Sequence, residues 1–316
     1  MRKYFNILLV MIFSLPIFSV EGSIGNASAY NTQLKKKKVV FVAGKDSHGR
    51  GEHEFRAGTH LLAKLLNESK LDIEAVVTED GWPADPAIFN DVDVIVMYSD
   101  GGAGHMVLPH LEEVDKLIKQ GVGIIAMHYA IEVPKGEPGD YFSQWFGGYF
   151  ETFYSVNPFF IPEFEKYPKH QIVNGVKSIN IKDEWYYHMR FDSSAKLTPI
   201  LQAHPPLSTL LPELNSVRGN NEFVRKDLQA GKVQTMAWSF ERPDGGRSFA
   251  FTGGHYHVNW ANDDFRKLIL NAIVWTAKLE VPENGVITAT PSASEMEYLL
   301  KAPRVPRGNQ TSSAAH

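Results

Sequence analysis

The chain has 316 residues, of which 43% are hydrophobic and 22% are charged, and its formal net charge is −4. This is ordinary globular composition, with enough apolar residues to build a core. The basic surplus typical of nucleic-acid-binding proteins is absent, so no nucleic-acid partner is expected. The chain contains no cysteine, which excludes a thiol nucleophile and disulfide bonds.

Residues 1–29 have the order of a secretory signal peptide. Arg2-Lys3 precedes an apolar run from Phe5 to Val20, and Ala27-Ser28-Ala29 offers an Ala-x-Ala cleavage site. An uncleaved membrane anchor is the alternative, but the run is short for a spanning helix. We therefore expect a periplasmic or extracellular protein with no stable membrane insertion after cleavage of the signal.

From Lys38 onward, segments with the pattern of buried strands alternate with segments of helical spacing. Strands are predicted at residues 39–43, 73–77, 92–98 and 122–127, and helices at about 55–66, 109–121 and 264–279. Strands joined by helices in this order form a right-handed, mostly parallel sheet that is covered on both faces. The predicted fold class is α/β, a flavodoxin- or Rossmann-like three-layer sandwich.

The remaining segments have weaker patterns. Residues 136–214 are rich in Pro, Tyr, Phe and Asn, so we expect loops and short strands that decorate the sheet without joining it. Pro243-Asp244-Gly245-Gly246 separates two apolar segments and predicts a β-hairpin. Residues 281–316 show little periodicity and are predicted to be a C-terminal tail, which leaves a domain of residues 36–280.

Polar side chains are concentrated in the loops that follow the predicted strands. Seven of the twelve histidines stand in loops that follow a strand or open a helix. Open parallel sheets bind ligands beyond the carboxyl ends of their strands. A single histidine there is more often structural, but several converging loops favour a functional pocket. The residues expected to line it are His48, Asp100, His128, Glu184 and His255.

Residues 182–190 are a second concentration of polar chemistry. Glu184, Tyr186 and His188 would share one face of a strand, and Asp183 would project to the other. An aromatic-rich strand with a solvated carboxylate explains the same residues equally well. Glycine motifs of nucleotide-binding loops and the G-x-S-x-G elbow of serine hydrolases are absent.

A metal site is a further hypothesis. His255 and His257 are two residues apart, so both would ligate one ion from an extended segment, with His48 and His53 as additional donors. Three imidazoles or carboxylates at bonding distance would hold a divalent metal such as zinc. No HExxH or other tight motif is present, and neutral hydrogen-bonding histidines would leave the same sequence. Both interpretations stay open.

Several short motifs occur in an order that is similar to a known family. They are the Gly-rich strand 122–128 ending in His, Gly147-Gly148, His170-Gln171-Ile172, Asp183-Glu184-Trp185, Ala237-Trp238, Gly254-His255 and a final helix ending in Trp275. Together they resemble the ThuA-like (trehalose utilisation) family from about Lys38 to Leu279. The resemblance implies the fold of class I glutamine amidotransferases and a role in sugar metabolism, on oxidised (keto) glycosides.

The chain departs from the family pattern at two places. Gln171 follows His170 where proline is usual, and Gly147-Gly148 is not followed by the histidine that many members carry. Amidotransferases place a nucleophilic cysteine near the position of His128, so the resemblance extends to the fold but not to glutaminase chemistry.

Two functions compete. The first is an exported enzyme, a hydrolase, lyase or isomerase that acts on a disaccharide, glycoside or keto-glycoside. Its candidate acid–base residues are His128, Glu184 and Asp46, and its candidate substrate contacts are His48, His53, Asp100, Tyr129, Trp185, Trp260 and Asn259. The second is a non-catalytic carbohydrate-binding protein in which Trp145, Tyr154, Trp185 and Trp260 stack on sugar rings. No pattern in the sequence indicates an oligomeric state.

Overall fold

A computed structural model describes residues 35–214, 216 and 218–302. The predicted signal peptide and the end of the predicted tail lie outside these residues. In the part of the chain that is described, no helix has the length and apolar character needed to cross a membrane.

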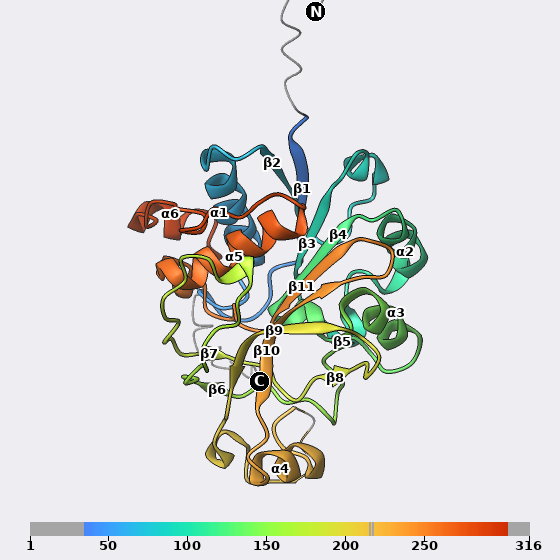
Figure 1. The fold of residues 1–316 in the computed structure, drawn as a ribbon, viewed down its shortest axis with the longest axis vertical. Coiled ribbons are helices and arrows are strands. Elements are labelled where there is room, and N and C mark those ends of the chain that lie inside the picture. The colour runs from blue at the N-terminus through green and yellow to red at the C-terminus, as the bar shows by residue number, and fades with distance from the viewer. Residues whose placement is uncertain (1–34, 215, 217, 303–316) are drawn as a thin grey trace, which may run out of the picture. The chain divides into compact units, whose positions relative to one another are not determined.

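The main sheet has seven strands in the order β2-β1-β3-β4-β11-β10-β9 (Figure 1). Its strands are β1 (Lys37–Ala43), β2 (Ile73–Thr78), β3 (Val94–Tyr98), β4 (Gly123–Met127), β9 (Leu197–Ala203), β10 (Gln234–Glu241) and β11 (Arg247–Phe251). The first five in spatial order run parallel, whereas β10 and β9 pair antiparallel with their neighbours. The predicted α/β class with a mostly parallel sheet is confirmed.

Helices cover both faces of this sheet. On one side lie α1 (Phe55–Glu68) and α5 (Asp263–Thr276), and on the other lie α2 (Leu111–Lys119) and α3 (Glu137–Phe146) (Figure 1). In β1, Val39 and Phe41 face the first layer while Val40 and Val42 face the second. Because both faces are buried, the strand is a continuous apolar run and does not alternate.

Two elements differ from the expectation for residues 136–214. The ten-residue helix α3 forms there, and β9 joins the main sheet as its edge strand by pairing with β10. The prediction that this region stays outside the sheet is therefore wrong for β9. Pro199 interrupts its pattern, and a strand accepts proline at a sheet edge because the missing N–H is not needed there.

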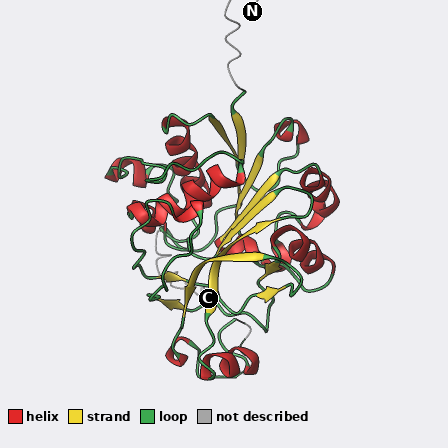
Figure 2. Cartoon of the chain, in the orientation of Figure 1, coloured by secondary structure: helices red, strands yellow, loops and turns green. Residues whose placement is uncertain are grey.

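The rest of this region consists of short elements, as the sequence predicts. Two small antiparallel sheets pair β5 (Gly148–Tyr149) with β8 (Arg190–Phe191) and β6 (Phe159–Phe160) with β7 (Asp183–Glu184) (Figure 2). The helix α4 (Glu222–Gln229) follows. Single 3₁₀ turns are η1 (Pro86–Phe89), η2 (Gly102–Gly104), η3 (Leu108–His110), η4 (His128–Ile131), η5 (Gln171–Val173), η6 (Leu207–Thr209) and η7 (His257–Ala261).

The C-terminal half ends with the predicted hairpin and a segment that packs on the domain. The strands β10 and β11 pair antiparallel, which confirms the hairpin. Residues 281–302 belong to the predicted tail, yet Val281 and Val286 are buried. The short helix α6 (Ala293–Glu297) follows, and the Lys301 amide donates to Glu54 in the loop after β1. This part of the chain is thus held against the first loop.

Candidate functional site

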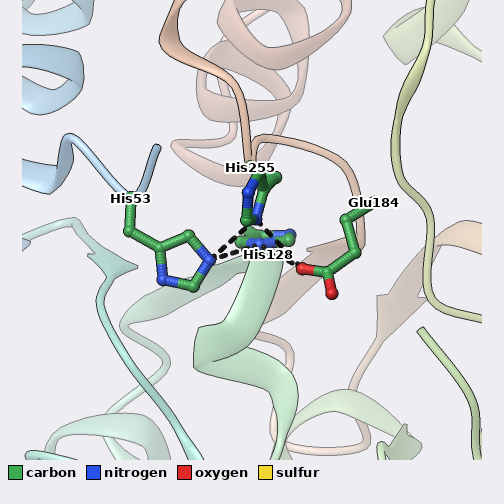
Figure 3. Close-up of side chains that lie close together, drawn as sticks. All are labelled: His53, His128, Glu184 and His255. Atoms are coloured by element: carbon green, nitrogen blue, oxygen red, sulfur yellow. Dashed lines mark hydrogen bonds and ion pairs between the residues drawn. The ribbon is translucent and has the colours of Figure 1, made fainter. Parts of the chain in front are cut away.

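Three histidines and one glutamate converge at the carboxyl ends of the central strands (Figure 3). His128 directly follows β4, His255 comes shortly after β11, His53 precedes α1 and Glu184 ends β7. One donor atom from each of the four lies within 4.8 Å of the other three, and all four residues are buried. We call these four residues the histidine cluster.

The inward atoms of the cluster are close together. His53 Nε2 lies 3.0 Å from His255 Nδ1 and 3.1 Å from His128 Nε2. Glu184 Oε2 lies 3.0 Å from His255 Nδ1 and 3.4 Å from His128 Nε2. The buried Tyr186 hydroxyl lies 3.3 Å from His128 Nε2 and 3.4 Å from Glu184 Oε2. The cluster is therefore one connected polar network in the protein interior.

The outward nitrogens of two histidines meet oxygen acceptors. His53 Nδ1 donates to Asp100 Oδ1 over 2.9 Å, and His128 Nδ1 donates to the Thr252 carbonyl over 2.9 Å. Because these oxygens accept, the proton of each neutral ring sits on Nδ1 and the lone pair of Nε2 points into the cluster.

Local backbone conformation aims these rings. His53 has φ 45°, His128 has φ 55° and His48 has φ 61°, in the left-handed region that residues other than glycine seldom adopt. Such conformations are strained and gather at functional sites. Gly254, with φ 115°, lets the loop after β11 turn close to His128, whose Cβ would lie 3.5 Å from a Cβ at this position. His128 thus turns sharply off the end of β4.

Asp183 positions the loop that carries His255. Its buried carboxylate accepts hydrogen bonds from the Gly254 amide at 3.0 Å, the His255 amide at 2.9 Å and the Asn259 side chain at 2.8 Å. Asp183 and Glu184 point to opposite sides of β7, as the alternation of a strand predicts. Glu184 therefore faces the cluster while Asp183 fixes the backbone behind it.

Burial and pairing set the charges within the cluster. Burial lowers the pKa of His53 to about 3, against the opposing effect of the Asp100 carboxylate. Burial also disfavours the charged form of His128, but the adjacent Glu184 carboxylate outweighs it and raises the pKa of His128. Burial raises the pKa of Glu184, whereas its hydrogen bonds with His128 and His255 hold that pKa at about 2. At neutral pH the site therefore combines a carboxylate with a neutral His53.

Residues that are partly open to solvent surround the cluster. The His48 ring lies 3.7 Å from the His53 ring, and Ser47 donates to Asp100 over 2.9 Å. Tyr129 is half-buried, with its ring 6.0 Å from that of His53. On this side the buried network borders groups that a ligand in solution can reach.

Comparison with known proteins gives the family. The sequence model of the ThuA family, described as trehalose utilisation, matches residues 38–276 of the chain. The chain belongs to the ThuA family. Its members are proteins of carbohydrate metabolism, which agrees with the resemblance seen in the sequence. A search of curated proteins finds no significant match.

A solved structure of a putative ThuA-like protein has the same fold. That structure, from Bacteroides uniformis ATCC 8492, has a TM-score of 0.54 at 13% identity and covers 80% of this chain and 95% of its own. Another, from Parabacteroides merdae ATCC 43184, has a TM-score of 0.48 at 14% identity and covers 83% and 99%. At this identity the first of these supports the ThuA fold and nothing about the site.

Three cluster residues belong to motifs by which the chain resembles the ThuA family, and one does not. His128, Glu184 and His255 each stand in one of those motifs, whereas His53 lies in the first loop and was selected only for its place after a strand. The five residues expected to line one pocket lie around this cluster, because His48 and Asp100 both contact His53. Asp183 is the positioning residue that sequence reasoning did not place at the site.

Several predicted site residues lie elsewhere. Trp185 and Trp260 are fully buried in the core, where their rings pack against Phe265, and neither ring is open to solvent for stacking on a sugar. Trp145 is likewise buried. Aromatic side chains serve cores and ligand sites alike, and the sequence alone does not separate the two.

Other polar residues also lie elsewhere than the sequence predicts. Asp46 is exposed and lies near the charges of Arg56 and Lys301, outside the cluster. Asn259, a predicted substrate contact, donates a hydrogen bond from its side-chain amide to the Asp183 carboxylate.

The pairing of His255 with His257 is wrong, because the chain enters η7 at His257 and does not stay extended. His188, with φ 59°, turns away from Glu184, and its ring contacts the Tyr154 carbonyl and Asp227.

Proposed function

We propose that this ThuA-family protein is an exported enzyme that acts on a disaccharide, glycoside or keto-glycoside by acid–base chemistry of histidines and carboxylates. The observation that carries the proposal is the buried contact of His128 with Glu184, 3.4 Å apart, beside the neutral His53. Buried groups with displaced pKa values next to partly exposed residues are typical of catalytic sites.

The two histidines have different roles in this chemistry. His128, whose pKa is raised by Glu184, is the proton donor to a departing glycosidic oxygen. His53 is the proton acceptor, because its Nε2 carries a lone pair and Asp100 stabilises the imidazolium formed on its other side. In a keto-glycoside the carbonyl acidifies the adjacent C–H bond, so one base and one acid suffice to remove that proton and release the glycosidic oxygen.

An exposed aromatic side chain marks where a sugar ring would bind. Phe159 is 44% exposed, and its ring lies edge-on to that of His255, with centroids 4.9 Å apart. The half-buried Tyr256 ring lies 5.7 Å from Phe159. These rings form an apolar platform beside the cluster, which suits the apolar face of a pyranose. They take the place of the tryptophans considered from the sequence.

Binding without turnover is the second candidate function. Its original basis was a set of stacking platforms at Trp145, Tyr154, Trp185 and Trp260, and the three tryptophans are buried. Only Tyr154 is partly exposed, and the Arg190 guanidinium covers its ring at 3.4 Å. The structure therefore favours chemistry at the cluster over a stacking site built from these residues.

The test is a screen of the purified protein against glucosides and 3-ketoglucosides, followed by mass spectrometry of the products. We expect turnover of at least one class and a loss of about 100-fold or more in His128→Ala, as for other general acids. His257→Ala is the matched control, since it removes another buried histidine of the same loop outside the cluster. Measurable binding with unchanged sugars would support the second candidate.

Export is tested separately. Expression of the full chain in a Gram-negative host, cell fractionation and mass spectrometry of the N-terminus should yield a periplasmic or secreted chain that starts near Tyr30. A cytoplasmic chain that retains residues 1–29 would contradict export and leave the chemistry unaffected.

A further inference from the structure

We propose that the histidine cluster is a metal centre, in which His53 Nε2, His128 Nε2, His255 Nδ1 and Glu184 Oε2 bind one divalent transition-metal ion of the zinc class. The proposal concerns the same site as the proposed function and rests on it: with the ion bound, the Nε2 atoms of His53 and His128 are ligands, and polarisation of a sugar oxygen by the ion replaces proton transfer by these two rings. It rests on the spacing of the four donor atoms, on where the ring protons lie, and on the oxygens behind the rings.

The spacing fits coordination. A tetrahedral ion with ligands at ~2.0–2.1 Å holds those ligand atoms about 3.3–3.4 Å from one another. In the cluster, His53 Nε2 lies 3.0 Å from His255 Nδ1 and 3.1 Å from His128 Nε2. Glu184 Oε2 lies 3.0 Å and 3.4 Å from His255 and His128. Four edges of the polyhedron are thus within a few tenths of an ångström of the expected length.

The protons of the rings point away from the centre. Asp100 and the Thr252 carbonyl fix the Nδ1–H groups of His53 and His128, so two lone pairs face each other across 3.1 Å. Two lone pairs form no hydrogen bond, and the Glu184 oxygen adds a third acceptor. The nearby hydroxyl of Tyr186 brings one proton to this set. A cation at the centre satisfies all these acceptors together.

The groups behind the rings complete the pattern of a metal site. Metal-binding histidines commonly donate their other N–H to a carboxylate or a carbonyl, which fixes the ring and raises its basicity. His53 has Asp100 and His128 has Thr252 in this role, and His255 Nε2 lies 3.9 Å from Glu52. The carboxylates of Glu184 and Asp100 supply two negative charges against the two positive charges of the ion.

The donor types narrow the choice of ion. The cluster offers imidazole nitrogens and a carboxylate, and the chain has no cysteine. Imidazole and carboxylate ligands suit Zn²⁺, Fe²⁺, Mn²⁺ or Ni²⁺ and disfavour Cu⁺, which prefers sulfur. Such an ion would polarise a carbonyl or hydroxyl oxygen of a sugar by expanding from four to five ligands, as catalytic zinc ions can do.

The experiment measures metal binding without substrate. The mature chain, prepared without an affinity-tag histidine run and stripped with a chelator, is titrated with Zn²⁺ and with Co²⁺. Elemental analysis, calorimetry and the visible spectrum of the Co²⁺ form are recorded. We expect one equivalent of metal, a Co²⁺ spectrum typical of nitrogen and oxygen ligands, and a higher melting temperature with metal.

Variants locate the ion. His255→Ala and Glu184→Gln should each weaken binding by at least 100-fold, and Asp100→Asn, behind His53, by about 10- to 100-fold. His257→Ala should bind like the unaltered chain, because its ring lies outside the cluster. Circular dichroism of each metal-free variant shows whether it is folded. If an alanine variant does not fold, Glu184→Gln still tests the site, because glutamine has nearly the size of glutamate.

Two results would overturn the metal centre. One is a folded chain that takes up no stoichiometric Zn²⁺ or Co²⁺, which would leave a protonated His128 as the cation of the cluster. The other is uptake that His255→Ala and Glu184→Gln leave unchanged, which would place the ion elsewhere. Sugar turnover is scored apart from binding, so a chain that turns over sugars without metal retains the proposed function and loses this inference.

Discussion

Asp100 contacts His53 from outside the histidine cluster: its Oδ1 accepts the Nδ1–H of His53 at 2.9 Å, while His53 Nε2 faces His255 at 3.0 Å. The Asp100 carboxylate thereby fixes the orientation of the His53 ring and directs the lone pair of its Nε2 into the cluster. Ser47 supports the same carboxylate with a 2.9 Å hydrogen bond. The chemistry at the centre therefore depends on a residue that is 36% exposed in its side chain and lies at its border.

Replacing Asp100 with asparagine should preserve the fold and lower kcat by about 10- to 100-fold, because the neutral amide no longer stabilises positive charge on His53. Steady-state kinetics on the substrate found in the screen measures the effect. Asp46→Asn is the control, since Asp46 is exposed and outside the cluster. Equal losses of kcat in both variants would contradict the role of Asp100 in stabilising charge on His53.

Asp183→Asn should reduce both stability and activity. The buried carboxylate accepts hydrogen bonds from the backbone amides of Gly254 and His255. A hydrogen bond to a charged group contributes about 1.5–3 kcal/mol to stability. We expect a loss of roughly that size in the free energy of unfolding by urea. Asn259→Ala removes a single half-buried donor and should cost less. An Asp183→Asn protein as stable as the native chain would contradict the proposal that Asp183 holds the loop that carries His255.

Acid should destabilise the fold through His105. Burial lowers the pKa of His105 to about 4, from an ordinary value of 6.5. Between these values the unfolded chain binds a proton that the folded chain does not, so stability falls as the pH is lowered from 6.5 toward 4 and is unaffected by this group above 6.5. The contribution is at most about 3 kcal/mol.

Unfolding in urea at several pH values measures that slope. His105→Gln keeps an amide that can donate to the Ala130 carbonyl, which His105 contacts at 3.0 Å, but does not titrate. Its stability should therefore vary less over this range than that of the native chain. Parallel curves for the two proteins would assign the acid sensitivity to other groups.

Phe159→Ala should raise KM several-fold with little change in kcat, because the exposed ring would bind the sugar without touching the reacting atoms. Its melting temperature should change little. Phe223 is a matched control, as another exposed phenylalanine, 52% accessible, on α4. If both variants raise KM alike, or neither does, the aromatic platform is placed wrongly.

The parallel part of the fold is predictable because each strand is buried on both faces and reads as an unbroken apolar run, as in β1 and β4. The edge strand β9 lacks that signal, since it is half-buried and contains Pro199. Edge strands pack against fewer neighbours, so fewer of their positions are constrained to be apolar.

The candidate site is likewise predictable from the sequence only in part. Chain topology brings His128 and His255 to one edge of the sheet because each follows a parallel strand, and this much can be read from the sequence. Which way a ring points depends on single backbone angles, such as φ 59° at His188, which turns that residue from Glu184 toward Asp227. Burial of Trp260 likewise depends on packing against Tyr98, far away in the chain.

His53 and His255 are in contact although 202 positions separate them in the chain, and Lys301, still later, is bonded to the loop that carries His53. The centre is consequently among the last parts of the molecule that synthesis completes. A ribosome-bound or truncated chain that stops before residue 255 lacks one of the four groups. The four groups therefore come together only in a chain that extends past residue 255, and two separately expressed pieces divided in the exposed turn at Asp244 would each hold an incomplete cluster until they reassociate.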